Sequence, residues 1–205
     1  IFMVMRGFSF KKTHIFTTFL ENFYLLKNIN LTLEFDIPYN NQIELKYLTK
    51  LKKLLYIVAR DGNCTVNISK LSSEIGVSRA TVLNYLYYMK NARLLTLLLP
   101  EEDGEDSGRK PNKLYIHNPN LLNAVCLDEV DTGVMHKTFL LSQLCPVHRI
   151  NYSENADFLI DGTYNVNVCR EGERSRNRRE GIVMEDMAER GKGNIIPLWL
   201  AGFVY

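Results

Sequence analysis

Residues 67–95 read NISKLSSEIGVSRATVLNYLYYMKNARLL, and this stretch decides the fold. We expect Ser69 to cap a short helix that ends at Gly76, because glycine tolerates the left-handed conformation at a helix C-terminus. Ser78 is then expected to cap a second helix. The buried side chains of this second helix recur at helical spacing: Val82, Leu86 and Met89. Two short helices joined by a glycine-containing turn are typical of a helix-turn-helix.

A β-hairpin is predicted directly after the second helix. Leu94–Leu99 is expected to form the first strand and Lys113–His117 the returning strand, with a polar loop between them. The hairpin makes the motif a winged helix-turn-helix. The tip of the loop is acidic, which opposes contact with a DNA backbone. Its five acids are Glu101, Glu102, Asp103, Glu105 and Asp106.

The flanking regions predict helices before the motif and a mixed region after it. Residues 15–35 are expected to form an amphipathic helix that Pro38 stops. A second helix is expected over 44–60, and residues 118–149 are expected to be helical. The pattern then becomes strand-like, and residues 195–205 are predicted to form a buried strand.

These predictions together define an α+β fold with three parts. They are a helical segment at 1–40, a winged helix-turn-helix at 41–117, and a small α/β domain at 118–205.

The composition is that of a globular protein, and its charge is uneven. The 205 residues are 46% hydrophobic and 23% charged, which excludes a disordered chain. The net charge of +2 is a cancellation. Residues 1–94 hold 13 basic and 6 acidic side chains (net +7), and residues 95–205 hold 12 basic and 17 acidic ones (net −5). An anionic partner is therefore expected on the first half.

The cysteine pattern and the absence of two common motifs limit the function further. The four cysteines, at positions 64, 126, 145 and 169, form no C-x-x-C pair, so we expect free thiols, a cytoplasmic location and no metal. No apolar run reaches the ~20 residues of a membrane helix. The phosphate-binding pattern G-x-x-x-x-G-K-[ST] does not occur, so no cofactor is expected in this chain.

Double-stranded DNA is a candidate partner, because the second helix of such a motif lies in the major groove and its outward side chains meet base edges and phosphates. The alternative is that the winged helix is a scaffold or a protein-interaction module. The candidate nucleic-acid-binding residues are Lys70, Arg79, Thr81, Asn84, Tyr88, Arg109, Lys110 and Lys113.

Several segments make the chain resemble the C-terminal half of a group of bacterial and archaeal AAA-type ATP-binding proteins. The segments are LTLEFDIPY (31–39), LKKLLYIVA (51–59), ISKLSSEIGVSRATVLNYLYYMKNARLL (68–95), RKPNKLYIHNPNLLNAV (109–125), ADFLIDGTYNV (156–166) and GNIIPLWLAGFVY (193–205). The resemblance implies a P-loop ATPase domain, then a winged helix, then a domain of unknown function with a restriction-endonuclease-like fold. It also implies that the ATPase lies upstream of Ile1 and is a second candidate partner, so that this chain is a fragment.

The resemblance implies a nuclease-like site, from which this sequence departs. Such a site uses carboxylates to hold a divalent cation and a lysine to assist the attacking water. Asp157 stands where the first acid is expected, but the other three positions hold Asn167, Glu171 and Lys137. We therefore expect Asp157 to be vestigial and the chain to be no enzyme.

The preferred function is a DNA-binding or regulatory module of an AAA-type ATPase. Two alternatives remain open, namely a structural or protein-interaction module and a metal-dependent nuclease.

Overall fold

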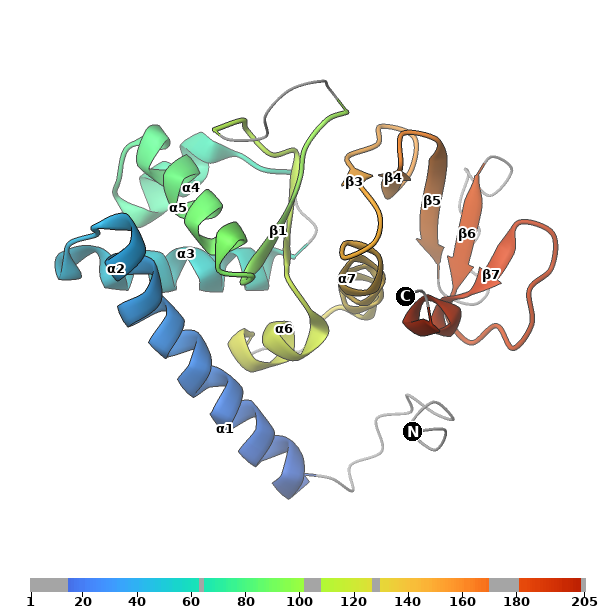
Figure 1. Cartoon of the computed structure of the whole chain (residues 1–205), viewed down its shortest axis with the longest axis horizontal. Helices are drawn as coiled ribbons and strands as arrows, with labels where there is room; N and C mark the ends of the chain where they lie inside the picture. The colour runs from blue at the N-terminus through green and yellow to red at the C-terminus, as the bar shows by residue number, and fades with distance from the viewer. Residues whose placement is uncertain (1–14, 63–64, 102–107, 127–129, 170–180, 204–205) are drawn as a thin grey trace.

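The computed structural model describes an α+β protein. Helices come first, a two-stranded antiparallel sheet follows, and a five-stranded mixed sheet lies in the C-terminal part (Figure 1). The described residues are 15–62, 65–101, 108–126, 130–169 and 181–203. The acids at 102–106 and the expected Glu171 lie outside them, as does Cys64.

The first helix is longer than predicted. Helix α1 (Ile15–Leu31) continues through a π-helical turn (Thr32–Asp36) into α2 (Ile37–Asn41). The prediction that Pro38 stops the helix is wrong, because this proline lies in the first turn of α2, where the missing N–H costs least. The helix ends at Gln42, whose backbone is left-handed (φ 52°).

Helices α3 (Leu48–Asp61), α4 (Ile68–Ile75) and α5 (Arg79–Asn91) follow in order. Helix α3 begins four residues later than predicted, after the 3-10 turn Leu45–Tyr47.

The turn between α4 and α5 is largely as expected. The prediction that Ser69 caps α4 is wrong, because the side chain of Asn67 accepts the N–H of Lys70 at 3.0 Å instead. Gly76 does end α4 in the left-handed region (φ 67°), and the Ser78 hydroxyl accepts the N–H of Thr81 at 3.1 Å. The three predicted stripe residues of α5 are fully buried. The arrangement of α4 and α5 therefore rests on one αL glycine and two side-chain caps.

The hairpin of β1 (Leu95–Leu98) and β2 (Lys113–Ile116) lies between two apolar cores. Side chains alternate across a strand, so the two faces of the hairpin belong to different cores. Leu95 and Leu114 lie in the first core with the helices, whereas Leu98 and Tyr115 lie in the second core with the C-terminal sheet. Figure 1 shows this hairpin between the helices on one side and the sheet on the other.

The region expected to be helical over 118–149 contains two separate helices. They are α6 (Pro119–Val125) and α7 (Thr132–Leu144). Helix α6 contacts α1, and its residues Leu122 and Ala124 lie in the first core. The division between the two cores falls within α7, whose Val134 and Met135 pack against the first core and whose Leu140 and Leu141 lie in the second.

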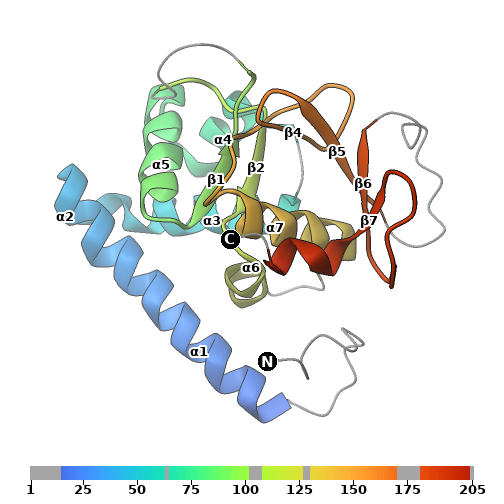
Figure 2. The ribbon, with the colours of Figure 1, turned by 45° about the vertical axis from the view of Figure 1, so that its right-hand side comes forward.

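The five-stranded sheet has the order β3-β4-β5-β6-β7. Strands β3 to β5 pair antiparallel, whereas β5, β6 and β7 pair parallel. Helix α7 contacts the 3-10 helix Leu198–Phe203, and both contribute to the second core on one face of the sheet (Figure 2). The strands are β3 (Ile150–Asn151), β4 (Phe158–Ile160), β5 (Tyr164–Cys169), β6 (Ile182–Glu185) and β7 (Ile195–Pro197).

The prediction of a buried strand over 195–205 is wrong. Strand β7 stops at Pro197, and the next six residues form the 3-10 helix. Trp199 and Phe203 are exposed and meet edge to face, with their ring centroids 6.1 Å apart. Proline removes a ladder hydrogen bond, which accounts for the end of the strand.

No helix in the described ranges is long and apolar enough to cross a membrane.

Candidate nucleic-acid interface

Exposed polar side chains lie at the start and in the middle of helix α5. Arg79, at the first position of the helix, and Asn84, in its middle, are exposed. Thr81 is half-buried, and its hydroxyl lies 2.8 Å from that of Ser78 at the cap. Tyr88 is half-buried, with its ring tilted against Tyr85 at 6.4 Å. All four predicted residues thus lie on α5, but only Arg79 and Asn84 are exposed.

Lysines of α3 hold the end of α4 in place. The ammonium of Lys50 donates to the carbonyl of Gly76 at 2.7 Å, and that of Lys53 donates to the carbonyl of Glu74 at the same distance. Cations at a helix C-terminus stabilise the carbonyls that have no partner within the helix. These two lysines therefore fix the turn that sets the start of α5.

The other predicted cations lie on both sides of α5. Lys70 is exposed on α4, with its ammonium 3.9 Å from the Asp61 carboxylate. The hydroxyl of Tyr87 on α5 donates to the carbonyl of Arg109 at 2.9 Å. This bond brings the base of the hairpin loop, with the exposed Lys110, next to the C-terminal half of α5.

Lys113 is separated from this group. In the hairpin register it pairs with Leu98, so it shares the face of the second core. Its ammonium lies 5.6 Å from the centre of the Tyr152 ring. Burial lowers the pKa of Lys113, the neighbouring Asp157 opposes this shift and Lys137 adds to it. The side chain of Lys113 therefore faces the C-terminal unit and not α5.

Sequence reasoning missed two residues on α5. Tyr87 joins the helix to the hairpin loop, and the ammonium of Lys90 lies 5.6 Å from the centre of its ring. Tyr87 is three residues after Asn84, the spacing that places two side chains on one side of a helix. The three-residue spacing from Asn84 could therefore have indicated Tyr87 from the sequence.

The predicted vestigial acid, Asp157, is held by two donors. Its Oδ1 lies 2.6 Å from the ammonium of Lys137 on α7, and its Oδ2 accepts the N–H of Val168 on β5 at 2.9 Å. The N–H of Asp157 in turn donates to Oδ1 of Asn167 at 3.3 Å. The structure therefore brings together three of the four positions that the resemblance singled out, and a lysine ammonium lies against the carboxylate.

The surroundings of Asp157 are largely buried. Tyr115 is buried, and burial followed by the Asp157 charge raises the pKa of its hydroxyl strongly. Nδ2 of the buried Asn167 has no hydrogen-bond partner. In the part of the chain that the structure describes, no three His, Cys, Asp or Glu side chains are grouped so that they could hold a metal ion. The cluster is thus a partly buried ion pair that joins α7 to β5 and the start of β4.

The structure is thus that of an α+β protein. It has exposed polar side chains on α5 and a partly buried ion pair between Asp157 and Lys137. Residues 17–134, more than half of the chain, match the model of a domain of unknown function (DUF8612), and the chain belongs to this family. The match runs from α1 into the start of α7, so it includes α5 and excludes Asp157. No curated protein and no solved structure matches the chain.

Proposed function

We propose that this chain is a DNA-binding or regulatory module that acts through a winged helix formed by α3, α4, α5 and the hairpin. The observation that carries the proposal is the exposure of Arg79 and Asn84 on α5, the helix that follows a capped glycine turn. An arginine can bind guanine through two hydrogen bonds, and an asparagine can bind adenine in the same way. The AAA-type ATPase of the resemblance would supply the ATP site, and the cytoplasm is the proposed location.

The hairpin limits how DNA is bound. Both faces of β1–β2 are covered, so a duplex would meet α5 and the base of the loop but not the strands. The cations on that side are Arg79, Lys70 and Lys110, and the net contact involves about three phosphates. At about −0.9 per phosphate, log K should fall with log salt with a slope of roughly −3.

Fluorescence anisotropy with a labelled duplex at low and high salt tests this proposal. Arg79→Ala should weaken binding by about 1–3 kcal/mol. Arg190→Ala is the matched control, because Arg190 is also exposed but lies between β6 and β7 in the C-terminal unit. No anisotropy change at low salt, or an equal loss in both variants, would overturn the DNA-binding role.

We propose further that the C-terminal unit has a restriction-endonuclease-like fold and does not cleave DNA with a metal. The ammonium of Lys137 at 2.6 Å from Asp157 supports this view, because a cation already neutralises the carboxylate. A plasmid-nicking assay with magnesium or manganese should show no cleavage. Nicking that Asp157→Ala abolishes would establish the nuclease alternative instead.

The second candidate function is a protein-interaction module, and a different surface favours it. Large apolar side chains on α1 and the segment after it are exposed: Phe23, Tyr24, Leu26, Leu31, Phe35 and Tyr39. Large apolar side chains that are exposed together on one segment favour an interaction site there. The upstream ATPase of the resemblance is one candidate partner for it.

A further inference from the structure

The two ends of the hairpin loop are held by different parts of the protein. On the outgoing side, the carbonyl of Leu99 accepts the N–H of Tyr152 at 2.7 Å, which ties the chain to the C-terminal unit. On the returning side, the carbonyl of Arg109 accepts the hydroxyl of Tyr87 on α5 at 2.9 Å. In Figure 1 the described chain before the loop accordingly lies toward the C-terminal sheet, and the chain after it lies toward the helices. The Tyr87 hydroxyl therefore ties the returning end of the loop to α5.

Basic side chains gather around Tyr87. Arg109 is half-buried, and Lys110, which follows it, is exposed. The ammonium of Lys90 lies 5.6 Å from the centre of the Tyr87 ring. Tyr87 is also three residues after Asn84, so these two side chains share a side of the helix. The cations around Tyr87 therefore lie beside the exposed Asn84, to which the proposed function assigns a base contact.

We propose that Tyr87 is a positioning residue for DNA binding, whose hydroxyl holds Lys110 where it contacts a phosphate of the duplex that meets α5. This inference rests on the proposed DNA-binding function and adds the part that the hairpin plays in it. Tyr87 and Arg79 are eight residues apart, which is about 12 Å along a helix. The major groove is about 12 Å wide, so a duplex that meets Arg79 extends to the base of the loop. Without the hydroxyl, Lys110 would have to be ordered when DNA binds, and this ordering costs affinity.

Two other roles of the Tyr87 hydroxyl lead to different results. A hydroxyl that only stabilises the fold changes the unfolding midpoint, but neither the DNA affinity of the folded chain nor its salt dependence. A hydroxyl that contacts DNA itself has an effect that adds to the effect of removing Lys110. A positioning hydroxyl acts through Lys110, so the effects of the two changes overlap and are not additive.

The test is a double-mutant cycle in the anisotropy titration of the full chain with a labelled duplex at several salt concentrations. Lys110→Ala removes one phosphate contact, so the slope of log K against log salt should become less negative by about 0.9. Tyr87→Phe keeps the ring and its contact with Lys90, and it should weaken binding about five-fold at low salt and change the slope in the same direction. In the chain that already carries Lys110→Ala, adding Tyr87→Phe should change the affinity by less than about two-fold.

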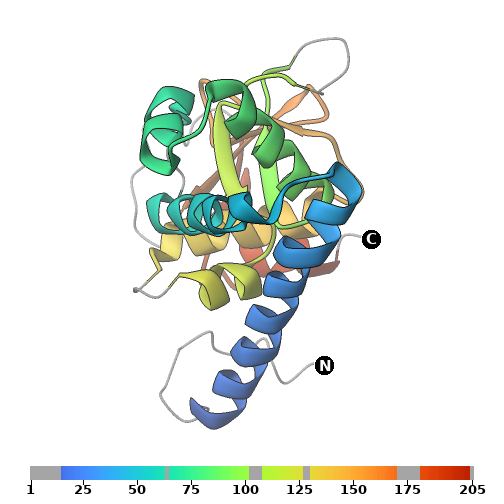
Figure 3. The ribbon, with the colours of Figure 1, turned by 90° about the vertical axis from the view of Figure 1, so that its left-hand side faces the viewer.

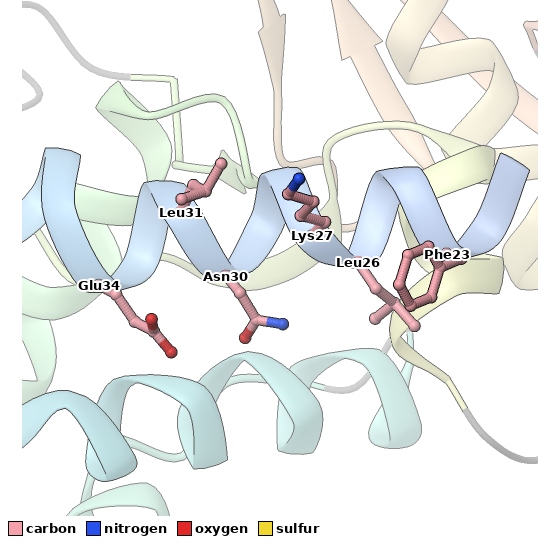
Figure 4. A pocket seen from close by; sticks show the side chains of 6 residues that line it. All are labelled: Phe23, Leu26, Lys27, Asn30, Leu31 and Glu34. Atoms are coloured by element: carbon pink, nitrogen blue, oxygen red, sulfur yellow. The ribbon is translucent and has the colours of Figure 1, made fainter.

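Two control variants match these changes. Tyr56→Phe removes the hydroxyl of another half-buried tyrosine, on α3, and should leave the affinity and the slope unchanged. Lys27→Ala removes an exposed cation on α1, where Lys27 lines an open pocket of about 450 Å³ (Figure 4). Figure 3 shows α1 extending away from α4 and α5, so this second change should leave the slope unchanged as well.

A second measurement tests the hydrogen bond without DNA. Trypsin cleaves after arginine, and Tyr87→Phe should speed cleavage after Arg109 in the folded chain, because it releases the returning end of the loop. Mass spectrometry of the fragments measures this rate, and Tyr56→Phe should leave it unchanged.

The outcomes separate this inference from the function on which it rests. If the chain binds DNA but Tyr87→Phe leaves the cleavage after Arg109 unchanged, or if its effect on affinity adds fully to that of Lys110→Ala, the positioning role is refuted and the DNA-binding function stands. If the unaltered chain binds no duplex at low salt, the DNA-binding function fails, and the positioning role fails with it.

Discussion

Replacing Asp157 by asparagine tests whether the ion pair between Asp157 and Lys137 stabilises the fold. Asparagine keeps an oxygen that can accept the N–H of Val168, so the change removes the charge and little else. It leaves the ammonium of Lys137 without its counterion at 2.6 Å, in side chains that are only 18% and 17% exposed. Lys113 faces the same carboxylate, so the variant also brings two cations together without an acid.

The expected loss follows from the partial burial. Breaking a fully buried pair costs about 3–5 kcal/mol, and the residual exposure lowers this to about 2–3 kcal/mol. At about 3 °C per kcal/mol for a chain of this length, the unfolding midpoint should fall by roughly 6–9 °C. Lys137→Met should cost less, because Asp157 keeps Lys113 as a neighbouring cation. The double variant Lys137→Met/Asp157→Asn should recover most of the loss, since it buries no unpaired charge.

Thermal and urea unfolding followed by circular dichroism measures all three variants. Glu44→Gln serves as the control, because Glu44 and Lys46 form an ion pair that is exposed on both sides, and the midpoint should not move. The reasoning is refuted if Asp157→Asn melts with the unaltered chain, or if the double variant is no more stable than Asp157→Asn alone.

Three further predictions concern single groups. Gly76→Ala should cost about 1 kcal/mol in urea unfolding, because φ is 67° there, and Gly76→Asn should cost less. Burial raises the pKa of the Cys145 thiol to about 11, so iodoacetamide at pH 8 should label Cys145 slowly, as mass spectrometry would show. The hydrogen bond from His148 holds the pKa of the Asp161 carboxyl below its ordinary value. This pair therefore stabilises the fold at pH values above the unfolded pKa of Asp161. The stabilisation is lost as the pH falls through the lower folded pKa. NMR titration should show that His148→Ala raises the pKa of Asp161.

The turn between α4 and α5 was predictable because its determinants are local. The αL turn at Gly76 and the cap at Ser78 depend on residues within one or two turns of each other, and the structure confirms both. The predicted cap at Ser69 lies two residues after the observed cap, because Asn67 is also a good capping residue. Which of the two residues caps the helix depends on where the backbone leaves the β-bridge at Thr65.

Two features of the candidate site depend on contacts distant in sequence. The side chain of Lys113 lies on the face of the hairpin that packs in the second core. The sheet that completes this core begins more than thirty residues later in the chain. Lys137 and Asp157 are twenty residues apart and meet only because α7 packs against β5 of the sheet. Apolar patterning predicts that elements exist, but not which faces meet, so these contacts could not be derived from spacing.

The shared hairpin links the stability of the two units without linking their surfaces. Leu98 and Tyr115 belong to the second core, while Leu95 and Leu114 hold α5 through the first. Loss of the C-terminal unit would therefore expose one face of the hairpin and weaken the support of α5. The outward residues of α5 do not contact the Asp157 cluster, however, so Asp157→Asn should leave DNA affinity unchanged at temperatures where the variant is folded. A loss of affinity that tracks the unfolded fraction would agree with this arrangement, whereas a loss in the fully folded variant would place the cluster in the interface itself.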